Sequence, residues 1–152
     1  MRRNEIFIGI FVILAIIGIA IGVKKAKKTT QLPLALPSPS TVEQIQKTFN
    51  VTIPAGMEEA DLKAVGSIEG MGVATRKWQD GKFTLTILAD LPSPIGQPYR
   101  AWLENAEGAK IQLGTLRIAK GGYLLDFESA VNYPDYKKVV VAQAANVLEG
   151  SF

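Results

Sequence analysis

An unbroken apolar segment near the N-terminus constrains this chain more than any other feature. Residues 6 to 23 read IFIGIFVILAIIGIAIGV and contain no charged or strongly polar side chain. A helix of that length, at about 1.5 Å per residue, spans roughly 27 Å and matches the hydrocarbon core of a bilayer. Residues 6 to 23 are therefore predicted to be a transmembrane helix that contacts the lipid bilayer. Four lysines follow it, where a cleaved signal peptide would need small residues, so an uncleaved signal anchor is favoured.

The charges around this segment and the composition of the rest of the chain favour opposite orientations. Arg2 and Arg3 precede it and four lysines follow it, so counting cations alone favours a cytoplasmic C-terminus. The tail of residues 1 to 5 has no room for a function, however, and the large C-terminal part lacks cysteine, as an exported domain without disulfides can. We expect the N-terminus in the cytoplasm and the C-terminal domain outside it, at the cell membrane.

Gly18 and Gly22 form a GxxxG pattern within the apolar segment. Such a pattern lets two helix backbones approach closely, although glycine is common in membrane helices. A homodimer that pairs through Gly18 and Gly22 is one hypothesis.

The composition changes abruptly after the apolar segment. Residues 24 to 44 read KKAKKTTQLPLALPSPSTVEQ, and their three prolines favour extended geometry, so they are predicted to form a semi-rigid stalk. The folded domain is expected over residues 45 to 152.

Composition also excludes several kinds of chemistry. The 152 residues contain no histidine and no cysteine, which removes imidazole and thiolate metal sites as well as Ser-His-Asp and Cys-His catalysis. No cofactor is predicted. The net charge is +3, but residues 1 to 28 carry +5 and the rest of the chain carries −2. Because that remainder has no basic stripe that could follow a phosphate backbone, nucleic-acid binding is not expected.

Beyond residue 44 the apolar residues alternate with polar ones, which is typical of half-buried strands. Residues 83 to 87 show this pattern clearly, with Phe, Leu and Ile separated by threonines. Asp80-Gly81 predicts a hairpin, as do Glu107-Gly108 and Lys120-Gly121-Gly122, whereas Leu91 to Pro98 is typical of a crossover between sheets. About seven strands are predicted, near residues 62–69, 72–78, 82–89, 99–105, 110–118, 122–128 and 137–144.

Seven short strands in about 100 residues predict an all-β fold of the immunoglobulin-like β-sandwich type. Short helices are considered over Val42 to Phe49 and over Glu58 to Leu62.

Residues 88 to 116, LADLPSPIGQPYRAWLENAEGAKIQLGTL, resemble the C-terminal extracytoplasmic domain of the anti-sigma-K factor family. The resemblance is carried by Leu91-Pro92, Pro94 and Gly96, then Tyr99 and Trp102-Leu103, and finally Leu113-Gly114. It extends more loosely from about Val65 to Ala142. The resemblance implies a domain outside the cytoplasm that senses or serves as a scaffold.

The chain departs from that family in two ways. Anti-sigma factors of the family hold the sigma factor with a cytoplasmic N-terminal domain, and only Met1 to Glu5 precede the apolar segment here. The Glu-Pro-containing segment that usually follows the last strand is replaced by residues 144 to 150, AANVLEG. The resemblance therefore implies the outer half of such a system without its sigma-binding half.

Few residues are candidates for a site. Asp126 and Glu128 flank Phe127, so their carboxylates share one strand face about 7 Å apart, as in a glycosidase pair, a weak cation site or an ordinary solvated face. Tyr133 and Tyr136 lie in an aromatic loop that either binds a partner or closes the end of the sandwich. Trp102 is out of phase with its inward neighbours and is a third candidate for partner binding, whereas Trp78 is expected in the core.

We expect a non-enzymatic, membrane-anchored domain for protein interaction or sensing, with a protein partner in the envelope. The alternative is an envelope protein that binds or processes glycans with surface carboxylates and aromatic residues. Carboxylates clustered in a cleft would favour catalysis, whereas an exposed aromatic patch at one end of the sheets would favour binding.

Overall fold

Nine antiparallel strands make up most of residues 39 to 152, the part of the chain that the computed structural model describes. They are hydrogen-bonded in the order β5-β4-β8-β9-β1-β2-β3-β7-β6, so the predicted all-β class is confirmed. The strands are β1 (Glu58–Ala64), β2 (Met71–Gln79), β3 (Lys82–Asp90), β4 (Arg100–Asn105), β5 (Lys110–Thr115), β6 (Arg117–Ala119), β7 (Gly122–Ser129), β8 (Tyr136–Ala142) and β9 (Asn146–Ser151).

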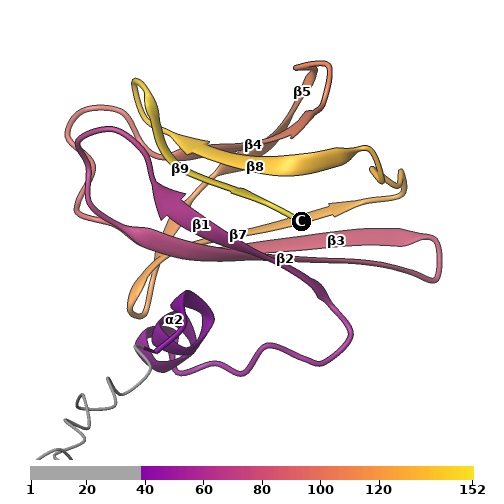
Figure 1. The fold of residues 1–152 in the computed structure, drawn as a ribbon, viewed down its shortest axis with the longest axis horizontal. Coiled ribbons are helices and arrows are strands. Elements are labelled where there is room, and N and C mark those ends of the chain that lie inside the picture. The colour runs from indigo at the N-terminus through magenta and orange to yellow at the C-terminus, as the bar shows by residue number, and fades with distance from the viewer. Residues whose placement is uncertain (1–38) are drawn as a thin grey trace, which may run out of the picture. The chain divides into compact units, whose positions relative to one another are not determined.

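The sheet curls on itself, so that β5, β4, β8 and β9 face β1, β2, β3 and β7 (Figure 1). The two halves are joined where β9 pairs with β1 over only two residue pairs, Lys63 with Glu149 and Ala64 with Leu148. The two outer edges of the sheet also lie close together. A Cβ added at Gly114 of β5 would lie 3.5 Å from the Leu125 side chain of β7. The core between the halves contains fully buried side chains from both, including Leu62, Leu85, Ile87, Tyr99, Leu103, Val139, Val141 and Leu148.

Helix α2 (Thr41–Phe49) covers the outer face of β2 and β3. Ser40 begins it with a capping box, in which its hydroxyl accepts the Glu43 N–H at 3.2 Å and Glu43 Oε2 accepts the Ser40 N–H at 3.1 Å. Ile45 and Phe49, one helical turn apart, are buried against Val73 and Leu88. The helix predicted from Val42 to Phe49 is confirmed, and its first turn uses residues that the sequence assigned to the stalk.

The predicted connections are present. Asp80 and Gly81 both have positive φ angles, 53° and 74°, and join β2 to β3 in a two-residue hairpin. Hairpins also join β4 to β5 and β6 to β7, and residues 91 to 99 cross from β3 in one half of the sheet to β4 in the other.

Several details of the predicted strands were wrong. Residues 39 to 152 contain nine strands where about seven were predicted, and the first runs over Glu58–Ala64 where residues 62–69 were predicted. Glu58 to Leu62, considered as a helix, forms most of β1, because pairing with β2 and burial of Ala60 and Leu62 outweigh the helix propensity of Glu, Ala and Leu. The strand predicted over residues 110 to 118 is divided at Leu116, where the chain passes between the two halves of the sheet. Residues 146 to 151, which were not predicted as a strand, form β9.

The predicted transmembrane segment, with Gly18 and Gly22, and most of the predicted stalk lie outside the described residues. Among residues 39 to 152, no helix has the length and apolar character needed to cross a bilayer.

Candidate partner-binding site

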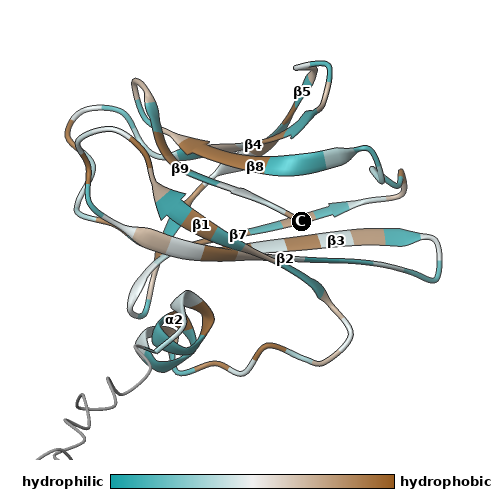
Figure 2. Cartoon of the chain, in the orientation of Figure 1, coloured by the Kyte–Doolittle hydropathy of each residue, from teal (hydrophilic) through white to brown (hydrophobic). Residues whose placement is uncertain are grey.

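Two connections meet at one end of the curled sheet, on the right of Figure 1: the β2–β3 hairpin and the β7–β8 loop. We call this end, with Arg76, Trp78, Phe83, Tyr133 and Tyr136, the aromatic end. Figure 2 shows β8 changing from hydrophilic at its start, beside this end, to hydrophobic along the rest of the strand. The opposite end holds the β3–β4 crossover and the β8–β9 turn.

Tyr133 is the centre of an aromatic cluster that closes the core at this end. Its ring contacts Phe83 edge-on, with centroids 5.3 Å apart, and lies 6.3 Å from Phe127 and 5.9 Å from Tyr136. Edge-on pairs at these distances stabilise by about 0.5 to 1.5 kcal/mol beyond burial. Tyr133 and Tyr136 are both partly buried against the main core. This burial agrees with the interpretation that they close the end of the sandwich.

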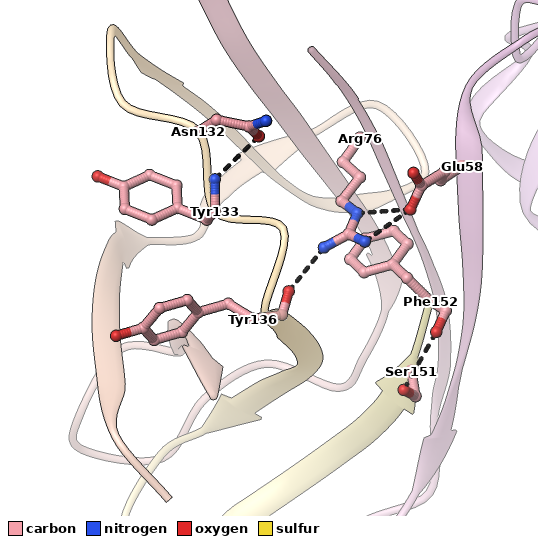
Figure 3. Close-up of polar contacts among 7 residues, drawn as sticks. All are labelled: Glu58, Arg76, Asn132, Tyr133, Tyr136, Ser151 and Phe152. Atoms are coloured by element: carbon pink, nitrogen blue, oxygen red, sulfur yellow. Dashed lines mark hydrogen bonds and ion pairs between the residues drawn. The ribbon is translucent and has the colours of Figure 1, made fainter. Parts of the chain in front are cut away.

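Short-range hydrogen bonds hold the β7–β8 loop in place. The Tyr133 hydroxyl lies 3.2 Å from the Ser129 hydroxyl, and Ser129 Oγ also accepts the Val131 N–H at 3.0 Å. Asn132 Oδ1 accepts the Tyr133 N–H at 2.9 Å (Figure 3). The loop therefore presents its aromatic rings in a fixed arrangement.

Arg76 is buried beneath this loop, with 8% of its side chain exposed. It donates from Nε and Nη2 to Glu58 Oε2 at 2.8 and 2.6 Å, and from Nη1 to the Tyr136 carbonyl at 2.6 Å (Figure 3). The guanidinium also stacks over the Phe152 ring, 4.2 Å from its centroid. One arginine thus ties together β1, the start of β8 and the segment after β9.

A cavity of about 240 Å³ lies at the surface of the aromatic end. Trp78, with 43% of its surface exposed, forms part of the wall, so the prediction that Trp78 belongs to the core was wrong. Its position explains the error, because it lies one residue from the end of β2, past Glu58, where the pairing of β1 with β2 begins. The cavity is lined by Glu58, Arg76, Lys77, Trp78, Phe83, Asn132, Tyr133, Pro134 and Lys137.

Trp102 lies apart from this site. It is a half-buried residue of β4, opposite in phase to the buried Ala101 and Leu103, and it pairs in register with Val140 of β8. Its side chain therefore belongs to the outer face of the sheet. Of the three candidates, Tyr133 and Tyr136 are brought together and Trp102 is not.

The paired carboxylates are engaged on the outer face of β7. Asp126 accepts the Thr86 hydroxyl at 3.0 Å and lies 2.7 Å from the Arg117 guanidinium. Glu128 lies 2.6 Å from the Lys82 amine. Within residues 39 to 152, no three side chains of the types His, Cys, Asp or Glu gather into a metal-binding group.

Sequence reasoning missed Arg76 and assigned Trp78 to the core. The alternation in β2 contained a signal for Arg76, because it is in phase with the inward Ala74, and an arginine at a core position requires partners. Comparison of the chain with protein-family models, with curated proteins and with solved structures finds no match.

Proposed function

We propose that this chain is a single-pass membrane protein that presents a non-enzymatic domain outside the cytoplasm, where the aromatic end binds a protein partner. The observation that carries the proposal is the cavity at that end, with the exposed Trp78 beside the fixed Tyr133 loop. Aromatic residues with rigid rings are enriched at the centres of protein interfaces. The apolar run of residues 6 to 23 supports an anchor in the bilayer, with the N-terminus in the cytoplasm.

We further propose that the domain is a variant of the immunoglobulin-like sandwich, similar to the outer half of an anti-sigma-K factor. Tyr99, which comes just before β4, donates its hydroxyl to the Pro92 carbonyl at 3.1 Å, much as the tyrosine corner of such sandwiches does. Leu91, Tyr99, Leu103 and Leu113, which carry part of the resemblance, are all buried in the core. The resemblance thus supports a shared architecture, and the partner has to be sought at the surface.

The second candidate function is binding of an envelope glycan, which the exposed Trp78 favours, since sugar rings stack on aromatic faces. Glycan processing has less support, because Asp126 and Glu128 each form an ion pair on a solvated face. Either function is compatible with a homodimer through Gly18 and Gly22.

Two experiments test the proposal. Protease digestion of a C-terminal tag in intact and permeabilised cells should cut the tag in intact cells or spheroplasts. Photo-crosslinking from a benzoylphenylalanine at position 78, compared with position 95 in the crossover at the opposite end, should capture a protein from position 78 only. Ile95 is a matched control because 92% of its surface is exposed. Protection of the tag until the membrane is opened would refute the orientation, and failure to capture a protein from position 78 would refute binding at the aromatic end.

A further inference from the structure

Asn50 begins the one Asn-x-Ser/Thr pattern in this chain. Residues 50 to 52 read Asn-Val-Thr, and none of the other four asparagines has serine or threonine two residues later. This pattern, with any residue except proline in the middle, is the acceptor of N-linked glycans in exported domains. The pattern also arises by chance, so its use depends on whether these residues are accessible and free of other roles.

The backbone explains why an asparagine can follow α2, but it does not use the side chain. Asn50 has φ 53° and ψ 47°, the left-handed conformation that ends many helices and that asparagine tolerates better than most residues. Its N–H donates to the Lys47 carbonyl at 3.3 Å. Asn50 is exposed, and its carboxamide forms no hydrogen bond with any other residue from 39 to 152. The helix cap therefore leaves the amide nitrogen available, and it gives no reason for a threonine at position 52.

The residues that follow Asn50 are accessible and weakly held. Thr52 is exposed, as is 41% of the Val51 surface. In the described part of the chain, the backbone of residues 52 to 56 forms no hydrogen bond with other backbone groups. A cavity of about 210 Å³ lies between residues 51 to 54 and the outer face of β2 and β3. Because such a segment opens at little cost, an enzyme can bind residues 50 to 52 without separating any pair of strands.

Asn50 lies away from the aromatic end. α2 ends beside the β6–β7 turn, where a Cβ on Gly121 would meet the Thr48 carbonyl. β7 begins at this turn, and its other end leads into the β7–β8 loop of the aromatic end (Figure 1). The 8 residues of β7 span roughly 27 Å at about 3.4 Å per residue. A large group on Asn50 would therefore leave the cavity of the aromatic end open to a partner.

We propose that Asn50 carries an N-linked glycan, transferred from an oligosaccharide on a polyprenyl diphosphate. A bond forms between Asn50 Nδ2 and the anomeric carbon of the first sugar, and the bond from that carbon to the diphosphate oxygen breaks. One amide proton passes to a base of the transferase, and the polyprenyl diphosphate leaves. The Thr52 hydroxyl is the group that identifies the acceptor. Such transfer takes place outside the cytoplasm, so the inference rests on the orientation in the proposed function.

The test uses the full chain with a C-terminal tag, purified in a mild detergent from the membranes of the cells that naturally make it. Trypsin should release residues 48 to 63 as one peptide, because Lys47 and Lys63 delimit it and no lysine or arginine lies between them. Mass spectrometry with electron-transfer fragmentation locates any added sugar mass on Asn50. Thr52→Ala removes the acceptor pattern and keeps the helix cap, and Thr52→Ser keeps both. Protease accessibility of the tag is measured in the same cells.

We expect the wild-type peptide to carry the mass of at least one hexose or N-acetylhexosamine on Asn50. Thr52→Ser should keep this mass at equal or lower occupancy, and Thr52→Ala should lose it completely. An unmodified wild-type peptide from cells in which the tag is accessible would overturn the glycan and leave the proposed function intact. A protected tag would refute the orientation, and this inference with it. Sugar retained on Asn50 in Thr52→Ala would overturn the role of the Thr52 hydroxyl.

Discussion

Replacing Arg76 by methionine tests how the aromatic end is held together. Methionine keeps an unbranched apolar stem of similar reach, so the change mainly removes the guanidinium. Three interactions disappear: the ion pair with Glu58, the hydrogen bond to the Tyr136 carbonyl and the stacking on Phe152.

The magnitude follows from the exposure of each partner. Glu58 is 66% exposed and water can solvate it again, so the ion pair contributes up to about 1 kcal/mol. The charge-assisted bond to the Tyr136 carbonyl contributes about 1.5 kcal/mol, and the stacking on Phe152 about 1 kcal/mol. We expect Arg76→Met to lower the free energy of unfolding by about 3 kcal/mol, and Glu58→Gln by 1 kcal/mol or less, because glutamine still accepts one hydrogen bond.

Urea unfolding of the full chain in detergent, followed by tryptophan fluorescence, measures both changes, since Trp78 lies in the same cavity wall as Arg76. The double variant should show a coupling of about 0.5 to 1 kcal/mol between Arg76 and Glu58. Arg76→Lys is the control that keeps the charge and loses the fork, and it should fall between the wild type and Arg76→Met. A cost below about 1 kcal/mol for Arg76→Met would refute the argument that this arginine ties the three segments together.

Three further predictions concern other parts of the domain. Gly122→Ala should lower the free energy of unfolding by more than about 2 kcal/mol, because the new Cβ would meet the Ala89 carbonyl and lie 2.9 Å from the Phe49 ring. Gly108→Ala is the control, because a Cβ there would have nothing within 4 Å. It should show only the cost of its positive φ, about 1 kcal/mol. Thermal or urea unfolding of the two variants compares clash with backbone strain directly, and equal costs would contradict the close approach of Gly122 to Ala89 and Phe49. Ser40→Ala should cost about 1 kcal/mol and increase hydrogen exchange in α2 more than in β3, while unchanged exchange in α2 would argue against the capping box as its stabiliser. The hydrogen bond between the Lys138 amine and Glu149, whose ion-pair atoms are 3.0 Å apart, raises the pKa of Lys138 and lowers the pKa of Glu149. This ion pair should contribute less than about 1 kcal/mol to the free energy of unfolding, because both groups are partly exposed. The contribution should be present between about pH 5 and pH 10. It should be lost as the pH falls through the lowered Glu149 pKa, and lost as the pH rises through the raised Lys138 pKa. The unfolding free energy of Glu149→Gln and of the wild type across that range measures the difference, and a constant difference down to pH 2 would refute the assignment.

The sequence predicted the strands whose alternation is regular and whose ends are marked by glycine or proline. β3 is the clearest case, because Phe83, Leu85 and Ile87 face the core and Asp80-Gly81 determines where the strand begins. β9 had no such signal, because Val147 and Leu148 are adjacent and both buried, which breaks the alternation. The break at Leu116 was also hidden, since neither glycine nor proline occurs at residues 115 to 117, and Gly114 lies within β5.

The candidate site was only partly predictable for a related reason. Tyr133 and Tyr136 lie close in sequence, so a local pattern revealed them. Arg76 and Trp78 gain their surroundings from Glu58, Phe152 and the β7–β8 loop, which are distant along the chain. Which end of a strand extends past its neighbour depends on pairing register, and register is not visible in a single strand's composition.

Helix α2 has a mechanical consequence for a domain attached through its N-terminal side. Its buried contact with the sheet rests on Ile45 and Phe49, and the chain reaches β1, in the middle of the sheet, only after the helix ends. Tension applied at Pro39 therefore acts first on the small contact of α2 and only then on the hydrogen-bonded strands. Under a rising load, α2 should detach from the sheet in a separate early step. The chain between Pro39 and β1 would then extend while the nine-stranded sheet stays folded.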